Sequence, residues 1–131
     1  MKNKLIEDIY PCHVPDRLLD DQLLTFDLPA IIRNIKNEDA WKKGDRNAIT
    51  LLKNSSMRIV LIALQERAEI NFHQSGNLIS MQLLEGYLNF QTENQSILLR
   101  KDSLLTLHLP MKHSLIAMAE SVLLMTMVIC P

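Results

Sequence analysis

The chain has few of the residues that mark common functional classes. Only two cysteines, Cys12 and Cys130, occur in 131 residues. Neither has the CxxC or CxxH spacing of a metal site, so we expect the free thiols of a cytoplasmic protein. The three glycines are scattered and form no phosphate-binding loop, and no GxSxG elbow is present. These absences exclude a P-loop nucleotide site and an elbow-type serine hydrolase.

Charge of one sign and long apolar runs are also missing. The 14 basic residues are balanced by 15 acidic ones, which excludes the basic footprint of a nucleic-acid-binding protein. The stretch 1–10 lacks the apolar core of a signal peptide. The longest apolar stretch, 114–130, contains Glu120 and is too short to span a bilayer. We therefore expect a cytoplasmic protein that contacts neither membrane nor nucleic acid.

Residues 1–40 are predicted to form an arm and one short helix. Pro11 and Pro15 forbid a regular helix through residues 1–20, which indicates an extended arm. Pro29 suits a first helical turn, and isoleucines recur behind it at helical spacing, at positions 31, 32 and 35. Residues 37–39 end this helix, and a turn follows Trp41. We expect the tryptophan to plug one end of a barrel.

After Arg46 the apolar period changes to two residues, as in β-strands. Nine short strands are predicted, over residues 48–53, 57–64, 69–73, 78–84, 87–90, 96–99, 104–109, 113–118 and 122–129. The strand 57–64 is apolar on both faces, so its outer face should be covered by the N-terminal segment or by a second subunit. The pattern predicts one all-β domain, a sandwich or barrel, over residues 41–131.

Two histidines stand near the ends of the central run of strands, and their spacing resembles two motifs of the cupin family. The positions of the first motif fall on Arg67, His73, Ser75, Ile79 and Gly86. Those of the second motif fall on Asp102, His108, Pro110, His113 and Ala117. The gap of 15 residues between Gly86 and Asp102 is also typical of the family.

The stretches 81–86 and 105–113 read like the corresponding cupin segments, and 41–50 and 58–61 resemble the lead-in of one small-cupin group. The resemblance is to the small, single-domain, RmlC-like cupins. It implies an all-β jelly-roll barrel, the double-stranded β-helix, here preceded by an arm and a short helix.

The resemblance also implies a metal site, of which only part is present. Cupin enzymes generally hold Fe, Mn, Ni or Zn with three histidines and one carboxylate. Here His73 and His113 remain, while Ser75 and Ile79 replace the second histidine and the acid. Gln82 and Ser75 are the neighbouring polar candidates, and both are poor ligands for a transition metal. His108, an odd number of residues from His113, should point to the opposite strand face.

Three interpretations of His73 and His113 are open. They hold a divalent metal weakly, or they are polar groups in the mouth of the barrel that bind a small ligand, or they are structural. The missing acid favours a small-molecule-binding or interaction module without a metal, assembled as a homodimer. A divergent metal-dependent enzyme of the dioxygenase or isomerase class is the alternative.

Overall fold

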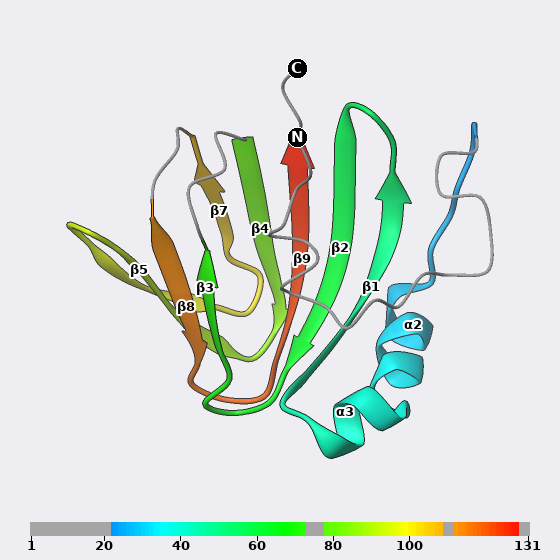
Figure 1. Ribbon diagram of the computed structural model, residues 1–131, viewed down its shortest axis with the longest axis horizontal. Helices are drawn as coiled ribbons and strands as arrows, with labels where there is room; N and C mark the ends of the chain where they lie inside the picture. The colour runs from blue at the N-terminus through cyan, green and yellow to red at the C-terminus, as the bar shows by residue number, and fades with distance from the viewer. Residues whose placement is uncertain (1–21, 73–77, 109–111, 129–131) are drawn as a thin grey trace.

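A computed structural model describes residues 22–72, 78–108 and 112–128. Within these residues, two short helices precede nine strands (Figure 1). The elements, in chain order, are α2 (Leu28–Ile35), α3 (Asp39–Lys43), β1 (Arg46–Lys53), β2 (Met57–Leu64), β3 (Glu69–Phe72), β4 (Leu78–Glu85), β5 (Tyr87–Thr92), β6 (Ser96–Arg100), β7 (Leu104–Leu107), β8 (His113–Ala117) and β9 (Ser121–Val128). All nine predicted strands are confirmed; the second has the predicted bounds, and the others differ by one or two residues at an end or have an end outside the described residues.

The strands form two antiparallel sheets that face each other. The five-stranded sheet has the order β1-β2-β9-β4-β7, and the four-stranded sheet has the order β3-β8-β5-β6. From β2 onward, most connections lead from a strand of one sheet to a strand of the other. This is the jelly-roll arrangement. The predicted fold class is therefore confirmed.

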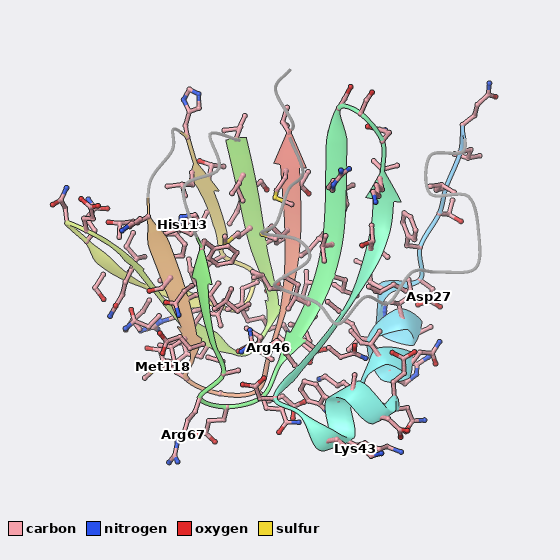
Figure 2. The ribbon with its side chains drawn as sticks, viewed as in Figure 1. Asp27, Lys43, Arg46, Arg67, His113 and Met118 are labelled. Carbon is pink, nitrogen blue, oxygen red and sulfur yellow. The ribbon has the colours of Figure 1, made fainter. Side chains whose placement is uncertain are left out.

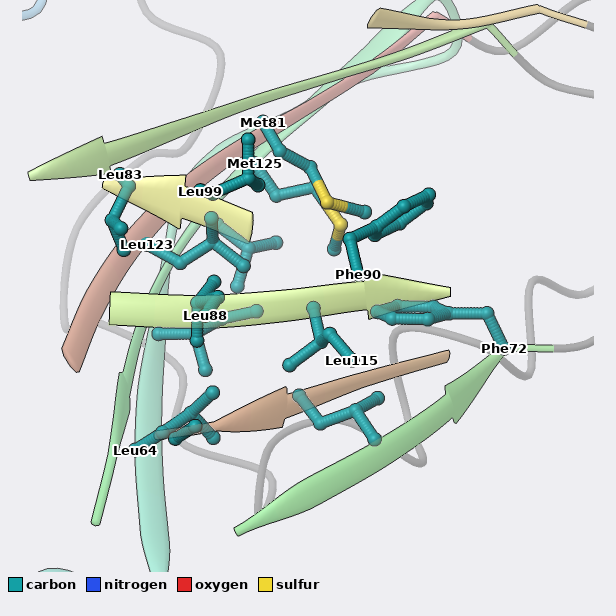
Figure 3. Close-up of a cluster of buried hydrophobic side chains, with 14 of the residues drawn as sticks. Leu64, Phe72, Met81, Leu83, Leu88, Phe90, Leu99, Leu115, Leu123 and Met125 are labelled. Carbon is teal, nitrogen blue, oxygen red and sulfur yellow. The ribbon is translucent and has the colours of Figure 1, made fainter. Parts of the chain in front are cut away.

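The core lies between the sheets and is filled by alternating strand residues. In β2, Val60, Ile62 and Leu64 point inward. They meet aromatic and sulfur side chains of both sheets, among them Phe72, Phe90, Met81, Met125 and Met127 (Figure 3). Because methionine is flexible, it fills irregular space between branched side chains. The described interior is packed by these apolar groups.

A second apolar cluster explains why β2 is apolar on both faces. Leu61 and Ala63 point away from the core and pack against Ile35 and Trp41 of the helices. Helices α2 and α3 thus cover part of the outer face of the five-stranded sheet (Figure 1). The sequence left open whether the N-terminal segment or a second subunit covers this face. In the structure, the N-terminal segment of the same chain covers this part of it.

Two expectations about this segment were wrong. Residues 39–43 form a second helix, α3, instead of a turn. Trp41 lies in that helix and is buried against the outer face of the five-stranded sheet, so it plugs no end of the barrel. The physical reason is that the apolar outer face of β2 and β9 offers the indole a larger dry surface than a barrel end. None of the described helices is long and apolar enough to cross a bilayer.

Buried and half-buried polar groups attach the helices to the sheet. The Asn47 Nδ2 donates to the carbonyl of Ile35 at 2.8 Å and to Glu38 Oε1 at 2.7 Å. The Gln65 Nε2 donates to the carbonyl of Trp41 at 2.8 Å. Helix ends leave carbonyls without intrahelical partners, and these amides satisfy them.

An exposed ion pair network links α2 to two loops at the same end of the barrel. Lys36 Nζ lies 2.7 Å from Glu120 Oε2 and 3.3 Å from Glu85 Oε1. Burial by itself lowers the pKa of Lys36, but the bond to Glu120 and the charges of both carboxylates outweigh it, so the pKa lies above 10.5. The ammonium therefore stays charged at neutral pH.

Three turns use the left-handed backbone conformation. Arg67 has φ 77°, Asp102 has φ 72° and Gly86 has φ 94°. All three are motif positions at which the resemblance to cupins implies a glycine, so the motif spacing located these turns even where the residue differs. An L-residue in this conformation costs about 1–2 kcal/mol relative to its favoured backbone.

Arg67→Gly is therefore expected to stabilise the protein. The gain should be about 0.5–1 kcal/mol, since relief of the left-handed strain exceeds the extra entropy of an unfolded glycine. Asp102→Gly should behave alike. Urea unfolding measures both, and Glu66→Gly, at the exposed neighbouring position without a positive φ, is the control that should not gain stability. A lower urea midpoint for Arg67→Gly would contradict the prediction.

Candidate functional site

His113 begins β8 and is wedged between two aromatic rings. Its imidazole stacks on Phe72 with ring centroids 4.6 Å apart and 17° between the planes. The ring centroid of Phe90 lies 5.3 Å from that of His113, with 32° between the two planes. The residue is 6% exposed. Strand pairing dictates this arrangement, because Phe72 of β3 is directly opposite His113, whereas Phe90 belongs to β5 on the other side of β8.

A hollow of about 330 Å³ lies at this end of the four-stranded sheet. Its walls come from three strands and from the residues that join them: Asn71, Phe72, Gln91, Thr92, Glu93, Lys112, His113 and Ser114. Most of these residues are polar, and one cation and one carboxylate are among them. The volume is at the lower end of the range for small-molecule pockets.

Strand register accounts for the polar part of the hollow. Ser114 of β8 is paired with Asn71 of β3 on one side and with Gln91 of β5 on the other. Their neighbours Phe72, Phe90 and His113 (the last is labelled in Figure 2) are buried in the core. By strand alternation, the three polar side chains therefore point to the outer face of the sheet. Two amides and a hydroxyl therefore form one row beside the hollow.

Of the four predicted site residues, the structure describes His113 and Gln82, and these two lie on different sheets. His113 lies at the hollow, whereas Gln82 is exposed on β4 of the other sheet, between the buried Met81 and Leu83. Gln82 thus points away from the core that His113 faces. His73 and Ser75 lie outside the described residues. His108 is exposed just after β7, while His113 is buried.

The described residues do not fit the metal that the fold implies. Ile79, at the position of the acid, is 1% exposed and packs in the apolar core. His113 is held by Phe72 and Phe90 on its two faces. Among the residues described, no three His, Cys, Asp or Glu side chains gather closely enough to hold a metal ion. The side chains at this end of the barrel therefore differ in chemistry from the donor set of a cupin metal centre.

Sequence reasoning missed most of the hollow. Gln91, Glu93, Lys112 and Ser114 come from separate stretches of chain, and no motif connects them. The available signal was the alternation of polar and apolar residues in each strand. That alternation shows which residues share a face of one strand, but the strands must be paired before polar residues of different strands can be placed together.

Comparison with known proteins supports the fold. No protein-family profile matches the sequence, and no curated protein matches it. Solved structures do match. A cupin superfamily protein from Desulfitobacterium hafniense has 16% identity and a TM-score of 0.66, over 87% of this chain and 99% of the other. An RmlC-like cupin from Shewanella frigidimarina has 15% identity and a TM-score of 0.66, over 86% and 96%.

An enzyme is also among the similar structures. A variant of salicylate 1,2-dioxygenase from Pseudoaminobacter salicylatoxidans has 13% identity and a TM-score of 0.72, over 92% of this chain. The present chain spans 41% of that enzyme. At these identities the likeness concerns the fold. The resemblance that the motif spacing indicated is thereby confirmed at the level of the fold: the chain has the jelly-roll fold of the cupins.

Proposed function

We propose that the protein is a binding module for a small polar molecule, held in the hollow beside His113. The observation that carries the proposal is the lining of that hollow. Asn71, Gln91 and Ser114 offer donors and acceptors from three adjacent strands, and Lys112 and Glu93 add one charge of each sign. A hydroxy acid or an amino acid has matching groups.

The position of His113 supports binding more than catalysis. Its imidazole is 6% exposed and stacks on Phe72 and Phe90 in the core. The row of polar side chains points to the opposite face of the sheet, so the ring is poorly placed for acid–base work on a molecule bound beside that row. General acid–base work would be helped by a carboxylate that orients the ring. At the acid position of the cupin motif the chain has Ile79, buried in the core.

Saturation-transfer NMR with lactate, serine and glucose as probes tests the proposal on the full-length protein. Binding of lactate or serine is expected, and Gln91→Leu with Ser114→Val should weaken it by about tenfold or more, since two polar partners of the bound molecule are lost. Gln82→Leu is the matched control, because it makes the same change at an exposed amide of the other sheet. Equal loss in the control, or no saturation transfer from any probe, would contradict the proposal.

Metal content tests the alternative, a divergent metal-dependent enzyme that uses His73 and His113. The dioxygenase among the similar structures is the reason to measure it. The untagged protein, purified without chelator, is compared by elemental analysis with a His73→Ala/His113→Ala variant. Stoichiometric metal that is lost in the variant would overturn the proposal of a metal-free binding module.

A further inference from the structure

The hollow beside His113 carries two opposite charges, which come from adjacent strands. Lys112 directly precedes His113 at the start of β8, and its side chain lines the hollow. Glu93 directly follows Thr92 at the end of β5 and lines the hollow as well. Thr92 and His113 are register partners, so the two charged residues continue neighbouring strands from one paired position. Neighbouring strands lie about 4.8 Å apart, so the ammonium and the carboxylate can reach one small molecule between them.

Neither charge serves a contact among the described residues. Lys112 and Glu93 form no ion pair with each other or with any other residue in the described part of the chain. Lys36, by contrast, lies 2.7 Å from Glu120 and attaches α2 to the barrel. Two opposite charges that share a hollow without pairing leave both groups available to a bound molecule.

Neutral hydrogen-bonding side chains form the second part of the hollow. Gln91 and Ser114 are register partners, two residues further along β5 and β8 from the charged pair. Asn71 extends this row onto β3. Two residues of strand span about 7 Å. A molecule of that length contacts the charges with one end and the amides and hydroxyl of the row with the other.

The charge pattern distinguishes among the small polar molecules that the proposed function allows. An α-amino acid carries a carboxylate and an ammonium on one carbon atom, so it satisfies Lys112 and Glu93 together. A hydroxy acid brings only the carboxylate and places it near Glu93, which repels it. An amine without a carboxylate meets the same repulsion from Lys112. Selection therefore comes from an unfavourable contact as well as from a favourable one.

We propose that the hollow selects a zwitterionic α-amino acid with a polar side chain over hydroxy acids and simple amines. This inference rests on the proposed function, because it specifies the molecule that is held at the same site. Lys112 binds the α-carboxylate, and Glu93 binds the α-ammonium. The row of Asn71, Gln91 and Ser114 binds the polar side chain.

Three probes that differ in charge test the inference on the full-length protein. L-serine carries both charges, lactate only the carboxylate and ethanolamine only the ammonium, and all three carry a hydroxyl group. An NMR titration followed at the backbone amides gives a dissociation constant for each probe. Serine should bind about fivefold more tightly than lactate or ethanolamine, as expected for one further ion pair at an exposed site.

Single-charge variants assign the two partners. Lys112→Met should weaken serine and lactate binding by about fivefold without weakening ethanolamine binding. Glu93→Gln should weaken serine and ethanolamine binding by a similar factor without weakening lactate binding. The matched controls are Lys101→Met and Glu66→Gln, which remove the same charges at exposed positions toward the other end of the four-stranded sheet. Circular dichroism establishes that all four variants are folded, which their exposure favours.

The outcomes separate this inference from the proposed function. Equal affinity for serine and lactate, or an effect of Glu93→Gln on serine binding no larger than that of Glu66→Gln, would overturn the selection of a zwitterion. The proposed function would still stand if lactate bound and Gln91→Leu with Ser114→Val weakened that binding. Absence of binding by all three probes would contradict the proposed function itself.

Discussion

Gly86→Ala should unfold at a much lower urea concentration than the wild-type protein, with a loss of about 3 kcal/mol or more. Gly86 forms the corner between β4 and β5 with φ 94°. A Cβ at this position would lie 2.6 Å from the Ser121 Cα, and closer still to Ser121 Oγ and the carbonyl oxygen of Glu120. Both a strained backbone and an overlap with neighbouring atoms therefore oppose the substitution.

Ser121 leaves the corner no room to relax. It is fully buried, accepts a hydrogen bond from the Tyr87 N–H at 3.0 Å and donates to the carbonyl of Ala119 at 2.8 Å. If Ser121 moved away from a new methyl group, these bonds would be lost. The effect should therefore appear as a shift of the urea midpoint with a similar slope, as expected for a change in native-state stability.

The Gly86→Asn variant separates backbone strain from atomic overlap as the cause of the destabilisation. Asparagine tolerates the left-handed conformation better than alanine, but it carries the same Cβ. We expect it to be at least as destabilising as alanine, because the overlap with Ser121 and Glu120 dominates. Recovery of wild-type stability by asparagine would show that backbone strain alone limits the position.

Asn47→Ala should be the second most damaging substitution, with a loss of about 2–4 kcal/mol. Asn47 is 1% exposed. Its amide nitrogen donates to Ile35 and Glu38, and its Oδ1 accepts from the Ala48 N–H at 2.9 Å. Alanine would leave the buried carbonyl of Ile35 without this donor and would remove the bond to Glu38. The helices would lose the link that holds them to β1.

Chemical unfolding followed by tryptophan fluorescence measures this effect, because Trp41 lies in α3 beside the link and is the only tryptophan. Asn47→Asp is the companion variant. It keeps the shape but replaces the donor with a carboxylate that faces the Ile35 carbonyl and Glu38, so it should be at least as destabilising as alanine. Gln65→Ala, at a half-buried position, is the control and should cost less. Equal effects of all three variants would contradict the assignment.

The strands could be predicted from the sequence because their signal is local. In β4, for example, the period of two residues lies within eight consecutive residues. The two cupin motifs likewise fixed the places of the left-handed turns at Arg67, Gly86 and Asp102. The chain keeps the spacing of the motifs although the residues at these positions differ. The left-handed backbone accommodates arginine and aspartate at a cost of about 1–2 kcal/mol.

The candidate site could not be predicted in the same way. His113 was identified as a polar group of interest, but its two aromatic neighbours come from β3 and β5. Gln82 lies exposed on β4 of the other sheet, on the face away from the core, and its place relative to His113 depends on how the two sheets pack. Gln91, Ser114 and Asn71 form a row only because three strands pair in one register.

Tertiary packing also decided where the N-terminal helices lie. The isoleucines of α2 predicted an apolar face, and the apolar outer face of β2 predicted a cover, but neither pattern specified that one would bury the other. Alternation is set by the geometry of consecutive residues, so it can be read along the chain. Which strands pair, which faces meet and which polar groups converge depends on the free energy of contacts between distant residues, and only the folded chain contains those contacts.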